Sequence, residues 1–336
     1  MHSVLVTGSA GFIGFHLSRQ LLDEGFRVIG LDAMTDYYDI ELKKARLKQL
    51  TSSKNYRAVE ERIETPGTLA DLFEYEKPNI VIHLAAQAGV RYSIENPRSY
   101  LESNINGTFE LIEAARAFPP KHMLLASTSS VYGANSDMPF QETQKSDYQM
   151  SFYAATKKAT ENMAHAYAHL FGLPITMFRF FTVYGPWGRP DMALFKFTKN
   201  ILAGQPIDIY NNGQMKRDFT YVDDLVKGIR LLIDAVPNPP EDGKVIKGDN
   251  LSPVAPFRVV NIGNSKQVQL MDYVNAVEDA LRIKAQYNFM PMQAGDVPST
   301  WANAELIHSL TGYKPETDVQ TGVRRFVDWY RDFYSI

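Results

Sequence analysis

The sequence predicts an α/β fold that combines a doubly wound parallel sheet with a smaller mixed α/β lobe. Through the first half of the chain, short apolar runs alternate with segments of helical period; the runs are 4–6, 28–31, 80–84 and 123–126, and the helical segments include 12–22 and 101–117. This alternation is typical of a parallel sheet with helices on both faces. The runs lack a strict apolar–polar alternation, which indicates strands that are buried on both faces.

The pattern changes near the middle of the chain. A helix over about 153–171 ends at Gly172, with Pro174 two residues beyond, which is a common arrangement at a helix end. A strand over 175–180 and a turn-rich aromatic stretch, 184–190, follow. We therefore expect residues 1–180 to form the first lobe and 181–336 most of the second, with segments near 215–262 as candidates for a return to the first. The second half also contains predicted helices over about 193–203, 222–235, 270–281 and 322–333, and a polar Pro/Gly-rich surface insertion over 237–256.

Composition excludes several classes of protein. The 336 residues include 35 Lys and Arg against 38 Asp and Glu, a formal net charge of -3, so no broad basic field favours nucleic acid. The chain has no Cys, so we expect no disulfide, no thiol nucleophile and no Cys-ligated metal, and the sequence gives no other reason to expect a metal. No run of about 18 apolar residues occurs and the N-terminus enters a strand pattern directly, so we expect no membrane span and a cytoplasmic location.

A glycine-rich loop follows the first predicted strand and opens the first predicted helix. Gly8 would permit the tight turn, Gly11 the close approach of a pyrophosphate, and Gly14 close helix packing. Phe12 and Ile13 begin the helix, whose N-terminus offers N–H donors and a positive dipole to phosphates. The loop therefore predicts a Rossmann-type dinucleotide site, and a simple strand-to-helix turn is the alternative.

Asp32 closes the second predicted strand, 18 residues after Gly14. An acidic side chain at this point can accept hydrogen bonds from both hydroxyls of the adenosine ribose, and it repels a 2′-phosphate. The residue therefore favours NAD over NADP, and a solvated Asp at a strand end is the alternative.

Tyr153 and Lys157 lie four residues apart on a predicted helix, so both side chains emerge on one face. A free phenol, with a pKa of about 10, is a poor base at neutral pH, but a neighbouring ammonium favours phenolate. The hydroxyl cluster 127–130 follows the end of another predicted strand, where open α/β sheets place ligands. Together these residues predict an active site, although an ordinary core tyrosine is the alternative for Tyr153 taken alone.

The motifs together resemble the extended short-chain dehydrogenase/reductase family, and within it the nucleotide-sugar epimerases. The resemblance covers essentially the whole chain and is carried by Gly8, Gly11 and Gly14, by Tyr153 and Lys157, and by the segments 84–88, 129–133, 179–186 and 217–224. It implies NAD as cofactor and a homodimer in which the segments 101–117 and 153–171 form a four-helix bundle. The same apolar helices are equally compatible with burial inside one subunit.

The resemblance implies a role for each matching residue. Tyr153 would accept the proton of the sugar 4-hydroxyl, Lys157 would hold the nicotinamide ribose and lower the pKa of the tyrosine, and Thr128 would complete the hydrogen bonding. Further cofactor contacts are implied at Leu84, Ala85, Ala86, Asn104, Phe180 and Val183, with packing roles as the alternative for Asn104 and Phe180. Many relatives have Asp-Ile after the third strand, whereas Ile63 here lies between Arg62 and Glu64, so adenine recognition departs from the family pattern.

The hydroxyl cluster helps to select the reaction. Related decarboxylases and dehydratases resemble this segment but carry acidic residues in it, whereas this chain has Thr128, Ser129 and Ser130 followed by Val-Tyr-Gly. The loops 88–93 and 185–193 are similar to those of the branch that inverts C4 of UDP-glucuronate. Substrate contacts are accordingly expected at Arg91, Ser129, Ser130, Thr182, Arg189, Arg217 and Asp296, with a structural ion pair as the alternative for Arg91 and Arg189.

Two other functions remain open on the sequence alone. A UDP-glucose or UDP-N-acetylhexosamine 4-epimerase would share the mechanism and differ only around C5 of the sugar. A non-catalytic NAD-binding protein would share the fold, because fold does not fix function.

Overall fold

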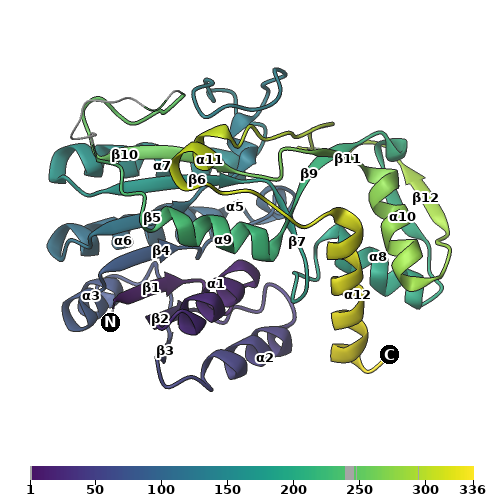
Figure 1. The fold of residues 1–336 in the computed structure, drawn as a ribbon, viewed down its shortest axis with the longest axis horizontal. Helices are drawn as coiled ribbons and strands as arrows, with labels where there is room; N and C mark the ends of the chain where they lie inside the picture. The colour runs from purple at the N-terminus through teal and green to yellow at the C-terminus, as the bar shows by residue number, and fades with distance from the viewer. Residues whose placement is uncertain (1, 239–245, 247, 294) are drawn as a thin grey trace.

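A parallel sheet forms the centre of the molecule (Figure 1). The structure is a computed structural model that describes residues 2–238, 246, 248–293 and 295–336. In this part of the chain the sheet has seven strands in the order β3-β2-β1-β4-β5-β6-β10, and every neighbouring pair is parallel. The strands are β1 (Ser3–Thr7), β2 (Arg27–Asp32), β3 (Tyr56–Glu60), β4 (Ile80–His83), β5 (His122–Ala126), β6 (Ile175–Phe180) and β10 (Phe257–Ile262). Strand order grows outward from β1 on both sides, as in doubly wound sheets, so the predicted fold class is confirmed.

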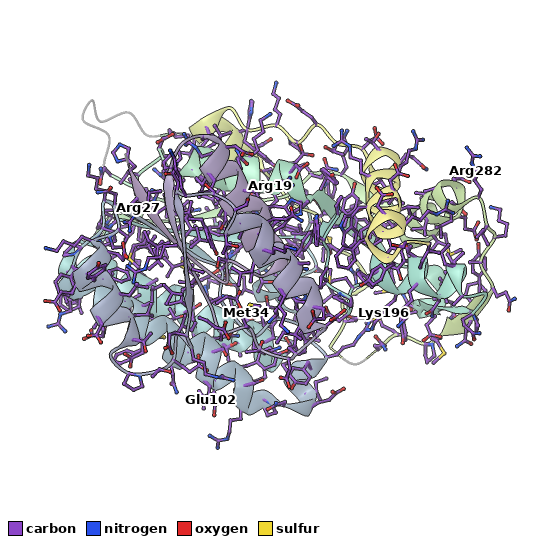
Figure 2. All side chains as sticks on the ribbon, turned by 90° about the horizontal axis from the view of Figure 1, so that it is seen from below. Arg19, Arg27, Met34, Glu102, Lys196 and Arg282 are labelled. Carbon is purple, nitrogen blue, oxygen red and sulfur yellow. The ribbon has the colours of Figure 1, made fainter. Side chains whose placement is uncertain are left out.

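Helices cover both faces of the sheet. On one face α1 packs against α9 and α2, and α9 also contacts α11; on the other face α6 packs between α3 and α7. Figure 2 shows this layering, with Arg19 of α1 on one side of the sheet and Glu102 of η1 on the other. The helical elements of this lobe are α1 (Phe12–Asp23), α2 (Ile40–Leu50), α3 (Thr68–Glu76), α4 (Tyr92–Glu95), α5 (Pro97–Tyr100), η1 (Leu101–Asn106), α6 (Gly107–Ala117), η2 (Ser129–Tyr132), α7 (Phe152–Phe171), α9 (Val222–Leu232) and α11 (Glu305–Thr311). Because β4 and β5 are buried along their whole length, the continuous apolar runs of the sequence are explained.

The single helix predicted over 101–117 has two parts in the structure. Its first part, η1, is a π-helix, and its second part, α6, is an ordinary α-helix. A π-helical turn contains one residue more per hydrogen-bonded ring than an α-helix, and such turns are frequent at functional sites.

A smaller lobe lies beside the sheet, to the right in Figure 1. It contains two small sheets, one in the order β11-β9-β7 and one that pairs β12 with β8 in parallel. Its elements are β7 (Thr182–Tyr184), α8 (Ala193–Leu202), β8 (Ile207–Tyr210), η3 (Asn211–Gly213), β9 (Lys216–Tyr221), β11 (Gln267–Gln269), α10 (Leu270–Leu281), β12 (Tyr287–Met290) and α12 (Val319–Tyr334). Between β9 and β11 the chain returns to the large lobe, where α9 packs on α1 and β10 pairs with β6. We therefore divide the chain after residue 180 and assign the α9–β10 segment to the first lobe.

Two regions complete the description of the fold. Among the described residues, none of the helices combines the length and apolar character that a bilayer span requires. Part of the predicted insertion over 237–256, residues 239–245 and 247, lies outside the described residues, as does residue 294.

A buried ion pair fixes α7 against β6 of the sheet. The Arg179 guanidinium on β6 donates to both carboxylate oxygens of Glu161, at 2.8 and 2.7 Å, and the Ser127 hydroxyl donates to the same carboxylate at 2.6 Å. Burial opposes ionisation of Glu161, but Arg179 and Ser127 outweigh it and lower the pKa of the carboxyl to about 2. Since both side chains are 2–3% exposed, neither charge can be solvated if its partner is removed.

Replacing Glu161 by Gln is expected to reduce the free energy of unfolding by about 3–5 kcal/mol at neutral pH, because the Arg179 cation stays buried without its carboxylate. The stabilisation by an acid with a depressed pKa is complete above its unfolded value, 4.5, and is lost as the pH falls toward 2. The difference between wild type and variant should therefore shrink over this range. Urea unfolding at several pH values measures it, with the exposed Glu74→Gln on α3 as control; a pH-independent difference would contradict the assignment.

Candidate active site

A pocket of about 850 Å³ opens at the carboxyl ends of the central strands, between the two lobes. Its wall includes the loops that follow β1, β2, β4, β5 and β6, and it continues along α8, β8 and β9 of the smaller lobe. Doubly wound sheets bind ligands at this end. The pocket brings together almost all of the residues predicted from the sequence: Gly8, Gly11, Phe12, Ile13, Gly14, Asp32, Ile63, Leu84, Ala85, Ala86, Arg91, Thr128, Ser129, Ser130, Tyr153, Lys157, Phe180, Thr182, Val183, Arg189, Arg217 and Asp296.

The glycine loop has the crowding that makes its glycines necessary. Gly8 has a positive φ of 72°, and its N–H donates to the Leu31 carbonyl at 2.7 Å. A Cβ at Gly14 would overlap the Gly8 carbonyl oxygen, and a Cβ at Gly11 would lie 3.0 Å from that same oxygen. Helix α1 begins at Phe12, so its free N–H groups point toward the pocket side of the loop. This compact loop at a helix N-terminus fits a dinucleotide pyrophosphate.

Asp32 is held by the backbone around the glycine loop. Its two carboxylate oxygens accept from Ala10 N–H at 3.0 Å and from Met34 N–H at 2.9 Å. The half-buried carboxylate still lines the pocket, beside the Lys43 ammonium, which donates to the Thr35 carbonyl at 2.7 Å. The alternative of a freely solvated strand end does not describe this geometry, and the predicted contact with the ribose stays a prediction.

Tyr153 and Lys157 lie on the first turns of α7, and both are buried in the pocket wall, at 8% and 3% exposure. The helix begins one residue before Tyr153, because the Ser151 hydroxyl at its N-cap accepts from Ala154 N–H at 3.1 Å. It ends where the sequence predicts, at Gly172, which adopts a positive φ of 67°. The Thr128 hydroxyl lies within hydrogen-bonding reach of the phenol. The helix thus places a phenol and an ammonium beside residues 128–130 of the hydroxyl cluster, which form the hydroxyl turn.

The pKa values of this pair follow from burial first. Burial raises the pKa of Tyr153, and the hydrogen bond with Thr128 and the Arg189 cation oppose this rise. Burial lowers the pKa of Lys157 to about 8, against the attraction of Glu161. Arg189 is the charged group that opposes the rise in the pKa of Tyr153. The lowering of this pKa by Lys157, which the family resemblance implies, stays a prediction.

The hydroxyl turn forms a short 3-10 helix, η2, capped by Thr128. The Thr128 hydroxyl accepts from Ser130 N–H and donates to the Ser130 hydroxyl, both at 3.2 Å. Ser129, Ser130 and the nearby Thr182 line the same side of the pocket. This turn presents hydroxyls and backbone N–H groups, and it contains no carboxylate.

Both arginines with open assignments make ion pairs and also line the pocket. Arg189 contacts the Asp191 carboxylate through Nε at 2.9 Å and a terminal nitrogen at 2.5 Å. Arg91 contacts Asp296 at 3.1 Å, which joins a loop of the large lobe to a loop of the smaller lobe. Asp296 also acts on the nearby Arg217, whose pKa is lowered mainly by burial. The two readings of these arginines are therefore compatible, since a paired guanidinium keeps further donors for a ligand.

Asn104 does not line the pocket but lies behind its wall, 1% exposed. Its side chain accepts from Gln87 N–H at 2.8 Å and donates to the Gln87 carbonyl at 3.1 Å and to the Thr156 hydroxyl at 3.0 Å. Ile63 lines the pocket and packs against Gly107, where a Cβ would overlap the isoleucine side chain. The flanking Arg62 pairs with Glu64 at 2.6 Å, so the departure from the family pattern at this point is a surface ion pair.

Many residues of the pocket wall were not predicted from the sequence, among them Tyr37, Tyr38, Lys43, Gln87, Glu95, Asp191, Lys196 and Tyr210. Most lie in loops or on elements of the smaller lobe, where no periodicity singles them out. Two weak signals were present in the sequence: the tyrosine pair that follows Asp32, and the acidic Asp191 two residues after Arg189.

Comparisons with known proteins place the chain in a family. The model of the NAD dependent epimerase/dehydratase family matches residues 4–246. The chain is 53% identical to a probable UDP-glucuronate 4-epimerase of Rhizobium meliloti, over 98% of this chain and 97% of the relative. It is 48% identical to UDP-glucuronate 4-epimerase 1 of Arabidopsis thaliana, over 99% of this chain and 77% of the relative. A crystal structure of UDP-glucuronic acid 4-epimerase from Bacillus cereus, in complex with UDP-glucuronic acid and NAD, matches with a TM-score of 0.88 at 31% identity, covering 99% of this chain and all of the other.

These matches extend over nearly the full length of the chain and include the glycine loop, Tyr153 and Lys157. The chain belongs to the NAD dependent epimerase/dehydratase family. The family and the cofactor predicted from the sequence, NAD, are thereby confirmed.

Proposed function

We propose that the protein inverts C4 of UDP-glucuronate, forming UDP-galacturonate reversibly through a 4-keto sugar and tightly bound NAD. One observation carries the proposal: the buried phenol and ammonium of α7 face a turn of hydroxyls without a carboxylate, in a pocket that runs from the glycine loop to Arg217. The related proteins of Rhizobium meliloti and Arabidopsis thaliana support the same reaction and substrate.

The cofactor fits the residues that the pocket presents. The crowding around Gly8 and Gly14 leaves the helix N-terminus open to a pyrophosphate, and Asp32 stands where a ribose would lie. Leu84, Ala85, Ala86, Phe180 and Val183 also line this pocket. When bound there, NAD would take the hydrogen from C4 and return it to the opposite face, and its nicotinamide cation would favour the phenolate.

Tyr153 acts as the proton acceptor of the 4-hydroxyl and later returns that proton to the 4-oxygen. Thr128 fixes the phenol by hydrogen bonding, and the Arg189 cation offsets part of the cost that burial imposes on phenolate. In this proposal Lys157 adds a second cation beside the phenol. Lys157, with a pKa of about 8, stays charged at neutral pH. Proton transfer therefore needs no water in the pocket, because the same oxygen gives and receives the proton.

The hydroxyl turn suppresses a side reaction that this substrate invites. A 4-keto uronate is a β-keto acid, so its C5–C6 bond can break with loss of carbon dioxide, the electron pair passing to the carbonyl as an enolate. Thr128, Ser129, Ser130 and Thr182 hold the carboxylate so that this bond is poorly aligned with the carbonyl π system. In the same proposal Arg217 binds the diphosphate of the substrate, Arg91 binds the diphosphate or the sugar carboxylate, and Asp296 lies in the loop that closes over the nucleotide.

A UDP-glucose or UDP-N-acetylhexosamine 4-epimerase is the second candidate, because the mechanism would be the same. The absence of an acidic residue in the turn 128–130 does not separate these sugars. The Gln at position 293, where UDP-glucose epimerases usually have Arg, favours the uronate branch.

The purified protein is expected to convert UDP-glucuronate to UDP-galacturonate without added cofactor. NMR of the products measures this conversion. A parallel reaction with UDP-glucose separates the two candidates.

Tyr153→Phe should lower kcat by about a hundredfold or more, because the proton acceptor is removed. Tyr313→Phe, which removes a buried hydroxyl outside the pocket, is the control; a fully active Tyr153→Phe variant would refute the mechanism.

Replacing Ser130 by Ala is expected to raise the fraction of UDP-pentose by-product about fivefold, since one hydrogen bond to the carboxylate contributes about 1 kcal/mol. Chromatography of the nucleotide products measures this fraction. The buried Ser146, which does not line the pocket, provides the matched Ser→Ala control. An unchanged by-product fraction would remove Ser130 from this role.

The proposed enzyme is a homodimer built on one helical face. Large apolar side chains remain exposed on and around η1, α6 and α7: Leu101, Phe109, Phe152, Leu170 and Phe171, each 39–66% exposed. The helices η1, α6 and α7 lie on the side of the sheet away from α1. In this proposal their exposed apolar side chains pack against a second copy of the chain. The exposure argues against complete burial of both helices inside one subunit.

Phe109→Glu is expected to convert the dimer to a monomer, because a charge would be buried at the centre of the apolar face. Light scattering on a sizing column gives the mass. Phe289→Glu replaces a phenylalanine of similar exposure, 53% against 45%, on β12 of the other lobe, and should leave the mass unchanged. A monomeric wild-type protein would contradict the proposal.

A further inference from the structure

Tyr100 contacts both the loop that carries Arg91 and the ring of Tyr153, and the proposed mechanism does not use it. The residue ends α5, directly before the π-helix η1, and its side chain is fully buried at 0% exposure. A tyrosine that is this deeply buried needs a partner for its hydroxyl. Tyr100 finds this partner in the loop that follows β4.

The hydroxyl group holds the loop that carries Arg91. It lies 3.0 Å from the Ala88 carbonyl and 2.5 Å from the Gly89 carbonyl, so its single proton is shared between two successive peptides. Four residues later, Asn104 binds both backbone groups of Gln87. The segment 100–104 therefore grips three consecutive residues of this loop.

The loop is crowded at the point where Tyr100 holds it. Gly89 has a φ of 106°, and a Cβ there would lie 3.3 Å from the Tyr37 hydroxyl and 3.6 Å from the Tyr100 hydroxyl. The next residues, Val90 and Arg91, reach the loop of the smaller lobe, where Arg91 meets Asp296. A small displacement at residues 88–89 would consequently move Arg91.

The ring of Tyr100 has a separate contact, with the phenol that we assign to proton transfer. The rings of Tyr100 and Tyr153 pack edge to face, with centroids 5.9 Å apart and an interplanar angle of 69°. Tyr92 packs on Tyr100 as well, at 6.2 Å. A tyrosine side chain has several staggered conformations, each of which points its hydroxyl in a different direction. A rigid neighbouring ring limits which of these conformations Tyr153 can adopt.

We propose that Tyr100 is a positioning residue with two separable actions: its ring orients the Tyr153 phenol, and its hydroxyl fixes the loop that presents Arg91 to the substrate. The inference rests on the proposed function for the identity of the substrate. It predicts that removal of the hydroxyl alone weakens binding, and that removal of the ring also slows the chemical step.

Two variants separate the actions. Tyr100→Phe should raise KM for UDP-glucuronate, and Kd for UDP-glucuronate and UDP, about five- to tenfold, which corresponds to the loss of a hydrogen bond. Its kcat should stay within about twofold, because the ring is retained. Tyr100→Leu should show the same weaker binding and, in addition, a kcat that is lower by about tenfold or more. Tyr313→Phe is the control for a buried hydroxyl, and the melting temperature and NAD content of each variant report folding.

A spectroscopic measurement tests the ring without turnover. In protein labelled with carbon-13 at the tyrosine ring, the Tyr153 signal is identified by its loss in Tyr153→Phe. This signal should keep its wild-type position in Tyr100→Phe and should shift or broaden in Tyr100→Leu. An unmoved signal in Tyr100→Leu, or unchanged Kd values in Tyr100→Phe, would overturn the corresponding action, and an equal fall of activity in both variants that follows the folded fraction would overturn both. A wild-type protein that converts no UDP-hexose would refute the proposed function, whereas the UDP affinity and the Tyr153 signal would still decide the role of Tyr100.

Discussion

The ionised state of Lys157 is the constraint on which the site depends, because its ammonium group is buried in the pocket wall. Burial lowers the pKa of this ammonium group, and Glu161, one helical turn further along α7, opposes this effect. Glu161 in turn stays ionised because Arg179 and Ser127 bind its carboxylate. A chain of buried groups thus runs from β6 of the sheet to Lys157 on α7. The Glu161–Arg179 pair, which is costly to break because neither charge can be solvated, also favours the charged state of Lys157.

Buried side chains also hold the backbone in place where the two lobes meet. Arg46, buried on α2, donates to the Ala10 carbonyl of the glycine loop at 3.0 Å and to the Trp187 carbonyl at 2.5 Å. His16 of α1 makes a similar link, with its ring nitrogen 2.9 Å from the Pro186 carbonyl. The loop that carries Arg189 is therefore tied to the cofactor loop, although 140 or more residues separate them along the chain. The residues proposed to contact cofactor and sugar therefore share one rigid frame.

The fold could be predicted from the sequence because its strongest signals are local. The apolar runs of β4 and β5 and the helical period of α7 and α10 arise from burial that neighbouring residues share, and the predicted bounds agree closely with the structure. The π-helix η1 could not be predicted, since one extra residue in a turn leaves the apolar spacing nearly unchanged. The short strands β8 and β12 were missed because they pair over about 80 residues, and each alone carries too few residues for a pattern.

The candidate site divides in the same way. The glycine loop, Asp32 and the pair Tyr153–Lys157 could be predicted because each motif is contiguous, and the structure places them in one pocket while their roles stay predictions. The charges that act on these residues could not be predicted, because they come from distant segments. The Arg189 cation opposes the rise in the pKa of Tyr153 that burial causes, and Asp296, which was expected to contact substrate, meets Arg91 across 205 residues of sequence. The charged neighbours of a site depend on the tertiary structure, whereas the groups proposed to carry its chemistry lie in short contiguous sequence motifs.

An enzyme that inverts a carbon centre must present both faces of one sugar to the same cofactor, and this requirement accounts for the distribution of rigid and adjustable contacts. In the proposed reaction the proton stays on Tyr153 while the ketone turns, so the phenol has to keep its direction through the turn; it is buried and packed against the ring of Tyr100. Elsewhere in the pocket Arg91 pairs with Asp296, and Arg217 lies near both, so in the proposed reaction the excess positive charge anchors the diphosphate while the sugar moves. The wall of the pocket also includes short hydroxyl side chains, those of Thr128, Ser129, Ser130 and Thr182. Hydroxyls can donate or accept as they rotate, so they can serve either orientation of the sugar ring, which a rigid charged contact could not do.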